Sequence, residues 1–494
     1  MKTEVAIAVG LVLYVVLTTA VSFFMLARVR KPADYLVAGR RLPFWVLVGT
    51  ITGTCIGTGS IIGGSALAYR HGWAGCAYPI GLGIGTLLTG LAFAHARRYQ
   101  FMTMIEEVAC YFDGNRVVTE FSNLSLFLSQ LCWVTVQIKG GAALLGAVTG
   151  LNPQLCVLLA GAAKAAISIP GGIKAVVYTD VIQTVILFFG FGCLVHSALR
   201  GAGGLAGLRQ SVPPDYFSFL GVSSLGGWNV ASLMLVLILN PVADPSRRLT
   251  MYAARDDARA KWSMVVSGIL VMLFSVTIGI AGMYSFRLNP HLPVADQALP
   301  WLAATVLPPW LAALVVVAVV SGMSSAANGT AAAAGTFFVR HIFPLVTGRY
   351  PARPVAVARW ALGFVFLFST ALAWFTGSIV GFVIEFMPLT MSGLALILLL
   401  GRFWKRATWQ GALAALLTTP LVSLAAMQFM DNPMLPAALT GTLAFVIVSF
   451  LTPPRRRSFE AVAAEMTRQR EHIEAPPGEN FAAVEPNPTI AQSK

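Results

Sequence analysis

Oxygen-bearing side chains recur within one apolar stretch of the sequence, residues 310–338. They are separated by steps of three and four residues, so a helix would place them on one face. They are Ser321, Ser324, Ser325 and Asn328. Oxygen ligands are what a hard cation such as sodium prefers. For this stretch taken alone, an alternative stays open in which the small hydroxyls only bond back to carbonyls of their own helix.

Two other apolar stretches contain residues that interrupt a helix. Residues 50–64 hold five glycines among hydroxyl side chains, and residues 237–246 hold two prolines with Asn240 and Asp244 beside them. An interior glycine lowers helix stability by about 1 kcal/mol and an interior proline by about 3 kcal/mol. Inside a membrane, non-helical backbone is tolerated where it lines a cavity, and its freed carbonyls can bind cations. The alternatives are glycines that only permit close packing and prolines that only kink the chain.

One carboxylate, Asp180, falls within an apolar stretch that follows Lys174. A charged side chain at membrane depth costs roughly 2.5–3.5 kcal/mol, so such residues usually carry function. Asp180 is a candidate site for a second cation or a proton, and the alternative is a capping or interfacial aspartate near Lys174. Lys139 and Glu385 also fall within apolar stretches, and the sequence gives them no role.

The composition predicts that most of the surface faces lipid. The chain has 494 residues, of which 57% are hydrophobic and 11% charged, against about 25% charged in soluble domains. The net charge of +14 comes from basic residues in short loops, so we expect a lipid bilayer and no nucleic acid as partner. The six cysteines show no CxxC pair and are interpreted as buried thiols.

We expect an all-α integral membrane protein with about thirteen membrane-spanning helices, each needing about 20 apolar residues. The predicted spans are 4–27, 43–69, 74–94, 117–149, 153–170, 176–198, 229–245, 263–286, 310–338, 354–375, 379–400, 407–427 and 434–452. Basic residues, including Arg247 and Arg248, fall in alternate loops. By the positive-inside rule this places the N-terminus outside and the C-terminus in the cytoplasm.

The predicted domain organisation is a transmembrane symporter domain over residues 1–452 and a cytoplasmic tail over 453–494. Two five-span repeats, about 43–200 and 229–400, each begin with an interrupted stretch, as in inverted-repeat transporters. The tail is expected to be largely disordered, although 458–474 could form a short helix. We expect a multi-pass protein of the cell membrane, the inner membrane if the source is bacterial.

Several motifs in the expected order resemble the sodium:solute symporter family, in its choline/proline-type branch. They extend from about Asp34 to Arg406 and comprise residues 34–43, 171–183, 247–256 and 323–343. The resemblance implies a leucine-transporter-like fold with inverted five-helix repeats and a sodium ion as coupling ion. It also implies that Asp180 matches a family position linked to a second cation. The implied sodium ligands are the backbone carbonyls of Gly53, Ile56 and Ser321 and the hydroxyls of Ser324 and Ser325.

The positions expected to bind the solute differ from the better-known patterns of that family. Cys55 and Val242 stand where choline carriers have tryptophans, although a quaternary ammonium favours aromatic faces. Pro79 replaces the acid of sugar carriers, and Leu237 and Pro241 replace aromatics of proline carriers. We therefore expect a small organic acid, an amino acid or another compact nutrient. The candidate solute-binding residues are Cys55, Thr58, Ser60, Trp133, Gln137, Asn240 and Pro241.

The predicted function is sodium-coupled import of a small organic solute by alternating access, with no cofactor and no required oligomer. The alternatives are a sodium-independent or proton-coupled carrier and a sensor that keeps the transporter fold without transporting. A channel is disfavoured because no selectivity-filter ring is recognisable. An enzyme is disfavoured because the sequence shows no nucleophile–base pair, metal cluster or phosphate-binding loop.

Overall fold

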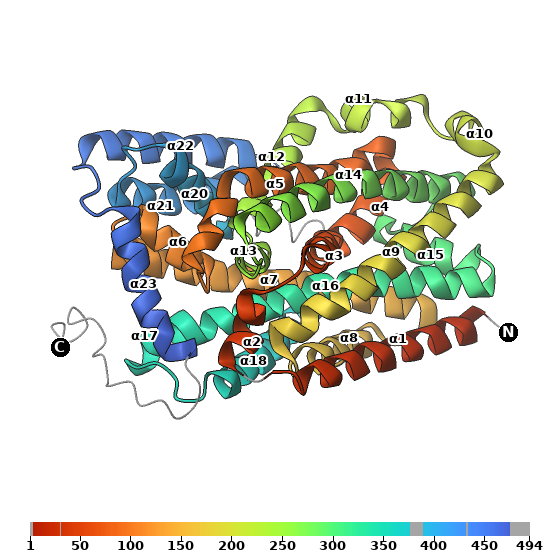
Figure 1. Ribbon diagram of the computed structural model, residues 1–494. Coiled ribbons are helices and arrows are strands. Elements are labelled where there is room, and N and C mark those ends of the chain that lie inside the picture. Colours follow the sequence, from red (N-terminus) through yellow and green to blue (C-terminus); the bar gives the residue numbers. More distant parts are fainter. Residues whose placement is uncertain (1–2, 30, 376–388, 431–432, 475–494) are drawn as a thin grey trace.

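The computed structural model describes residues 3–29, 31–375, 389–430 and 433–474, which form helices joined by turns (Figure 1). Most helices run roughly side by side along one direction, with the first near one edge and the last at one end (Figure 1). The helices are α1 (Thr3–Leu26), α2 (Pro32–Val37), α3 (Phe44–Cys55), α4 (Gly64–His71), α5 (Ala77–Phe93), α6 (Met104–Tyr111), α7 (Arg116–Thr149), α8 (Pro153–Ser168), α9 (Gly172–Ala202), α10 (Gly204–Gln210), α11 (Val222–Leu225), α12 (Gly227–Ala243), α13 (Pro245–Tyr252), α14 (Asp257–Leu288), α15 (Ala298–Thr305), α16 (Pro309–Phe337), α17 (Phe343–Thr347), α18 (Pro354–Phe375), α20 (Ser392–Phe403), α21 (Trp409–Ala426), α22 (Met434–Leu451) and α23 (Phe459–Glu474).

Nine helices of the described chain are long and apolar enough to cross a membrane, or ten when α12 and α13 count as one bent span. This number is smaller than the expected thirteen because interruptions shorten some apolar segments. Three apolar helices, α3, α8 and α20, have only 10–17 residues. The predicted span 379–400 and its Glu385 lie partly or wholly outside the described residues. The chain is thus an all-helical, multi-pass membrane protein.

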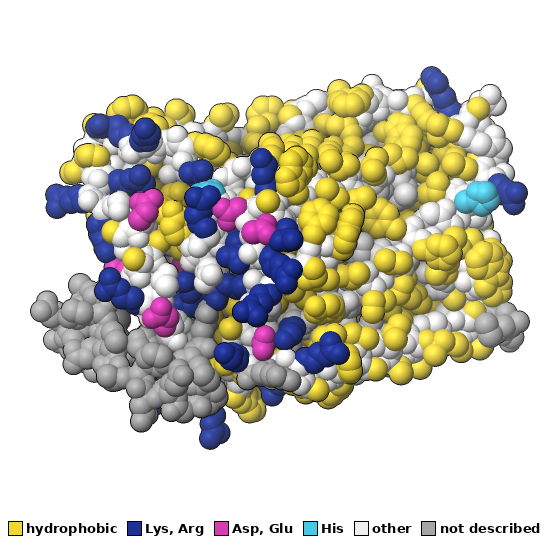
Figure 2. Space-filling view, viewed as in Figure 1, with side chains coloured by type: hydrophobic (Ala, Val, Ile, Leu, Met, Phe, Trp, Pro, Cys, Tyr) yellow, Lys and Arg dark blue, Asp and Glu magenta, His cyan; other side chains and the backbone are white. Residues whose placement is uncertain are grey.

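The surface separates charged from apolar side chains. Figure 2 shows Lys and Arg gathered at the end of the molecule where α2, α6, α17 and α23 lie, beside a broad apolar face. Helix α1 contributes to the apolar surface, with Val12, Leu13 and Val16 exposed. An exposed belt of this kind suits contact with lipid, and basic residues at one end are what the positive-inside rule predicts.

The first predicted interruption is present between α3 and α4. Helix α3 ends at Cys55, Ile56 has non-helical angles (φ −100°, ψ 67°), and a π-helical turn over Gly59–Gly63 leads into α4. The glycines of this segment explain the break, because they weaken the helix and allow close approach of neighbours. Local side chains satisfy part of the freed backbone: Ser60 Oγ donates to the Cys55 carbonyl at 2.9 Å.

The second predicted interruption lies between α12 and α13, which are bent by 42°. Asp244 is extended (φ −83°, ψ 110°) and Pro245 begins the next helix. Pro245 has no N–H to donate, so the helical ladder stops there. Asp244 then caps α13, because its Oδ1 accepts from Ser246 N at 2.8 Å and from Arg247 N at 3.3 Å. Both interruptions predicted from the sequence are confirmed.

Helix α16 brings the two interruptions together. It packs against α3 and α13, and α3 and α13 also contact each other. On its other sides α16 packs against α1, α7 and α9. The serine-bearing helix therefore lies beside both broken segments.

The end of the described chain is anchored to the basic end of the molecule. The predicted short helix of the tail is present as α23, which packs on α6. Buried Glu106 of α6 pairs there with Arg340 at 2.6 Å and with Arg470 of α23 at 3.3 Å. Residues 475–494 lie outside the described part of the chain, so the expectation of disorder there stays a prediction.

Arg247 and Arg248 correct one expectation of the sequence analysis, which placed them among loop charges. They are only 4% and 0% exposed, because α13 continues the interrupted span rather than leaving the protein core. Arg248 pairs with buried Glu107 at 3.5 Å and lies 3.9 Å from the centre of the Phe93 ring. Arg340 is buried as well, against Glu106.

Candidate cation and solute sites

The residues proposed for the coupling ion meet where α3 approaches α16. A Cβ atom built on Gly322 would lie 2.5 Å from the Ile56 carbonyl oxygen, so this carbonyl is directed at α16. A Cβ atom built on Gly53 would lie 2.6 Å from Ser325 Oγ. Ser321, Ser324 and Ser325 are all buried in the same region of α16. Glycine at positions 53 and 322 therefore allows backbone and hydroxyl oxygens to approach each other closely.

Several buried oxygens near this contact have no hydrogen-bond partner among the described residues. They are Thr52 Oγ1, Asp180 Oδ1, Gln183 Oε1, Ser321 Oγ and Ser325 Oγ. A buried polar atom without a partner is unfavourable by roughly 1–3 kcal/mol, and such atoms call for a missing ligand or water. Carboxylate, amide and hydroxyl oxygens that gather in this way are suited to binding a cation.

Asp180 lies next to this group of oxygens. It is fully buried, accepts a hydrogen bond from Thr50 on one carboxylate oxygen, and lies beside Ser325. The alternative of a capping or interfacial aspartate near Lys174 does not match the structure, because Asp180 lies inside α9 and is fully buried, while Lys174 Nζ pairs with Asp34 Oδ1 at 3.2 Å. Asp180 is thus a buried carboxylate with one unpartnered oxygen beside the serine-bearing face of α16.

Two neighbours of the serine face have structural roles of their own. Asn328, the fourth member of that face, accepts from Ser168 Oγ at 2.6 Å and so ties α16 to α8. Tyr14 of α1 accepts from Gln183 Nε2 at 2.7 Å and lies beside Ser324. Tyr14 was not among the predicted site residues, because nothing in the first apolar stretch indicates which neighbour it meets.

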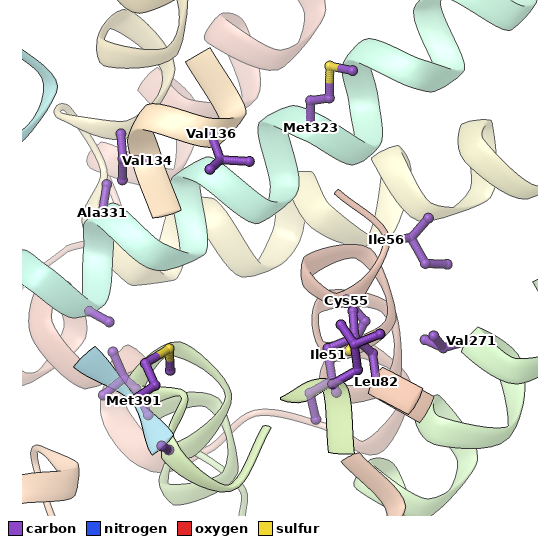
Figure 3. Packing of buried hydrophobic residues seen from close by; sticks show 14 of the residues in the cluster. Ile51, Cys55, Ile56, Leu82, Val134, Val136, Val271, Met323, Ala331 and Met391 are labelled. Carbon is purple, nitrogen blue, oxygen red and sulfur yellow. The ribbon is translucent and has the colours of Figure 1, made fainter. Parts of the chain in front are cut away.

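A narrow cavity lies against the first interruption, with a volume of about 20 Å³, which is room for about one water molecule. Its walls come from α3, α5, α7, α13 and α16 and from the two interrupted segments. The lining residues are Thr54, Cys55, Gly57, Gly59, Ser60, Tyr78, Leu82, Trp133, Gln137, Asp244, Arg247, Ala326 and Thr330. Figure 3 shows Cys55 and Leu82 close together beside Ile51, with the Ile56 side chain apart from them on the side of Val271.

Some of the predicted solute-binding residues line this cavity and others lie behind its wall. Cys55, Ser60, Trp133 and Gln137 are lining residues. Thr58 is buried and donates from both N and Oγ1 to Gln137 Oε1, each at 2.9 Å. Gln137 thereby supplies an acceptor to backbone that the interruption has freed.

Asn240 and Pro241 are also buried and outside the lining. Asn240 Oδ1 accepts from Arg247 Nη1 at 3.0 Å, and its Nδ2 lies 3.5 Å from Met391 Sδ. Trp133 Nε1 approaches the same sulfur at 3.3 Å. Asn240 therefore positions neighbouring side chains and does not itself form the wall.

The lining contains residues that the sequence analysis did not propose, above all Tyr78, Asp244 and Arg247. Asp244 and Arg247 are the charged members of the lining and form an ion pair at 2.7 Å. Their position in the sequence could have identified them, because they stand at the second interruption, where a short helix continues inside the protein.

A profile of the sodium:solute symporter family matches residues 35–419. The chain belongs to the sodium:solute symporter family. It is 24% identical over 467 residues to the sodium/pantothenate symporter of Haemophilus influenzae, covering 90% of this chain and 96% of the relative. The human sodium/myo-inositol cotransporter is also 24% identical, over 81% of this chain and 64% of its own length. This family member is accordingly a sodium-coupled solute symporter.

Solved structures of other carriers show the fold of this symporter. A substrate-bound, outward-open Na⁺-coupled sialic acid symporter is similar, with a TM-score of 0.81 and 19% identity, covering 92% of this chain and 98% of that chain. The transporter MhsT in complex with L-phenylalanine has a TM-score of 0.56 and 16% identity, over 83% and 98% of the two chains. The symporter thus has the leucine-transporter-like fold expected from the sequence.

Proposed function

We propose that this symporter imports a small organic solute with sodium by alternating access, and that the ion binds between α3 and α16. The observation that carries the proposal is the set of buried, unpartnered oxygens beside the Ile56 carbonyl and Ser325. The ligands would be the carbonyls of Gly53, Ile56 and Ser321 with the hydroxyls of Ser324 and Ser325. The solute would occupy the adjoining cavity once the surrounding helices move apart, as alternating access requires, because its volume of about 20 Å³ holds about one water molecule.

Sodium at this position would couple to the solute through the first interruption. The same segment supplies Gly53 and Ile56 to the ion and Cys55 and Ser60 to the cavity. An ion that orders this segment also shapes the solute site, which is positive coupling between two ligands. One charge moving through 100 mV contributes about 2.3 kcal/mol, or roughly 50-fold accumulation of the solute.

Asp180 is proposed as the site of a second cation. Its buried carboxylate and unpartnered oxygen support this role. A proton at the same carboxylate is the competing possibility, because a protonated Asp180 would also remove the buried charge. Uptake measured at fixed pH over a range of sodium concentrations distinguishes the second cation from the proton. A dependence on sodium alone favours the second cation.

We further propose thirteen spans with the N-terminus outside and the C-terminus in the cytoplasm of a bacterial inner membrane. The nine long helices, the bent pair and the three shorter apolar helices support this number. The basic end with α2, α6 and α23 would then face the cytoplasm. A relative that carries pantothenate and a structural neighbour that carries sialic acid make a small organic acid the first solute class to test.

The test is uptake into proteoliposomes under an imposed sodium gradient, with potassium replacing sodium as the comparison. We expect sodium-dependent uptake that Ser324→Ala with Ser325→Ala abolishes or shifts to sodium concentrations at least about 10-fold higher, since charged ligand contacts contribute about 1.5–3 kcal/mol. The matched control replaces two exposed serines, Ser211→Ala with Ser223→Ala. Sodium-independent uptake by the wild type, or unchanged sodium dependence in the double variant, contradicts the assignment.

A further inference from the structure

Arg247 places a buried positive charge in the wall of the solute cavity. It is 4% exposed and lies in the first turn of α13, directly after the second interruption. Its Nη1 donates to Asn240 Oδ1 at 3.0 Å and pairs with Asp244 Oδ2 at 2.7 Å. Its Nε donates to Cys55 Sγ at 3.2 Å, across the cavity wall.

These contacts leave one edge of the guanidinium poorly satisfied. A guanidinium has five N–H donors in a planar fork, and a thiol sulfur is a weak acceptor. Within the described residues, Nη2 of Arg247 has no hydrogen-bond acceptor, and Nε has only the Cys55 thiol. Burial of charged donors without strong acceptors is unfavourable, so this edge calls for a ligand.

A second buried arginine shows what a fully partnered guanidinium looks like in this protein. Arg340 donates from Nε to Glu106 Oε1 at 2.6 Å, from Nη1 to Tyr350 Oη at 2.7 Å and from Nη2 to Gln469 Oε1 at 3.2 Å. Each of its three nitrogens has a protein oxygen. Arg247 is similarly buried and lines the cavity, but it has oxygen partners on one nitrogen only.

Asp244 does not fill the open edge of Arg247. Its Oδ1 is occupied by the backbone N–H groups of Ser246 and Arg247, and its Oδ2 faces Nη1. The cap on α13 therefore holds this carboxylate in place on one side of the fork. The Nε and Nη2 edge has the spacing that binds a second carboxylate through two parallel hydrogen bonds.

We propose that Arg247 is a solute-binding residue that selects a compact carboxylate anion. This inference rests on the proposed function, because it takes the cavity beside the first interruption as the solute site. The carboxylate would displace the weak Cys55 contact, and the body of the solute would lie among Trp133, Tyr78 and Leu82. A cationic solute is disfavoured, because it would bring a like charge close to the guanidinium.

The test is the thermal stability of the full-length purified protein with pairs of probes that differ in charge alone. The probes are lactate, butyrate, benzoate and pantothenate, each beside its uncharged primary amide, measured in sodium and in potassium. A ligand that binds the native state raises its melting temperature. We expect at least one acid to stabilise the protein in sodium while its amide does not.

Arg247→Gln should weaken binding of that acid by about 10- to 100-fold, the value of a hydrogen bond to a charged group. In the Arg247→Gln variant, the acid and its amide should bind within a few-fold of each other. Arg247→Lys should keep part of the preference for the acid. Arg209→Gln, at an arginine outside the cavity lining, is the matched control and should bind like wild type. Stabilisation by sodium alone shows that each variant is folded. If Arg247→Gln does not fold, Asp244→Asn with Arg247→Gln removes both charges and should lose the same preference.

Three results would overturn the inference: no acid binds, neutral or cationic probes bind better, or Arg247→Gln keeps the preference for the acid. The sodium comparison separates this inference from the proposed function. A preference for acids without any effect of sodium retains Arg247 and rejects the sodium site. An effect of sodium without a preference for acids does the reverse.

Discussion

The two interruptions of this symporter differ in how they deal with freed backbone. The first, over residues 56–63, is made by glycines and contains no charged side chain. Its carbonyls turn toward α16 or accept from nearby hydroxyls. The second, at Asp244 and Pro245, is made by proline and is closed by a charged cap. One interruption presents neutral oxygens and the other a fixed ion pair. Under the proposals above, the first would bind the cation and the second would hold an anionic solute.

The largest effect on transport is expected from filling the first interruption. A Cβ atom on Gly59 would lie 2.1 Å from Tyr78 Oη and 2.5 Å from Tyr78 Cζ, so Gly59→Ala forces the buried Tyr78 ring to move. Overpacking of this kind costs about 1–3 kcal/mol, so uptake should fall by about 10- to 100-fold. Gly363→Ala is the control, since a Cβ atom there meets nothing within 4 Å. Equal uptake by the two variants in proteoliposomes would show that the close approach at Gly59 is not needed.

A smaller effect is expected from removing the cap of the second interruption. Asp244→Ala takes away the acceptor for two backbone N–H groups and the counter-charge of Arg247. Loss of a helix cap costs about 1 kcal/mol, so the melting temperature and the rate of uptake should both fall, the latter by about 5- to 10-fold. Asp244→Asn keeps an acceptor for the N–H groups and should retain more stability than the alanine variant. An equal loss in the two variants would mean that the charge, which both remove, dominates over capping at this position.

The smallest effect on transport is expected at Glu106, which is paired with two arginines outside the cavity lining. Burial alone would raise the pKa of Glu106, but Arg340 and Arg470 outweigh it and lower this pKa from 4.5 to about 2. The ionised form therefore stabilises the fold fully above about pH 4.5, and this contribution is lost as the pH falls toward 2. Glu106→Gln should flatten the fall in melting temperature over that window. Its sodium dependence at neutral pH should match wild type, and a shifted dependence would implicate the paired cluster in coupling.

The sequence predicted the parts of this molecule that depend on local pattern. The glycine and proline interruptions, the polar face at Ser321, Ser324 and Ser325, and the short tail helix all follow from spacing and propensity along the chain. The sequence did not predict how distant segments pack against each other. Thr58 is a residue of the kind expected to line the solute cavity. In the structure it donates to Gln137 of α7 and lies behind the cavity wall.

Arg247 shows the same limit for charge. A basic residue after an apolar stretch looks the same in the sequence whether it lies in a loop or in a short helix inside the protein. Only the position of α13 against α3 and α16 distinguishes the two. The number of spans was uncertain for a related reason, since an interrupted helix is too short to be recognised by length and composition.

The contacts of α23 bear on how this symporter should be handled in the laboratory. Arg340, just beyond the end of α16, and Arg470 of α23 share the single carboxylate of Glu106. Truncation before Phe459 would remove Arg470 and leave that carboxylate with Arg340 and the Met102 N–H among the contacts described, changing the support of the serine-bearing helix. Affinity tags and fluorescent reporters are therefore best attached after Glu474, where they keep the whole of α23.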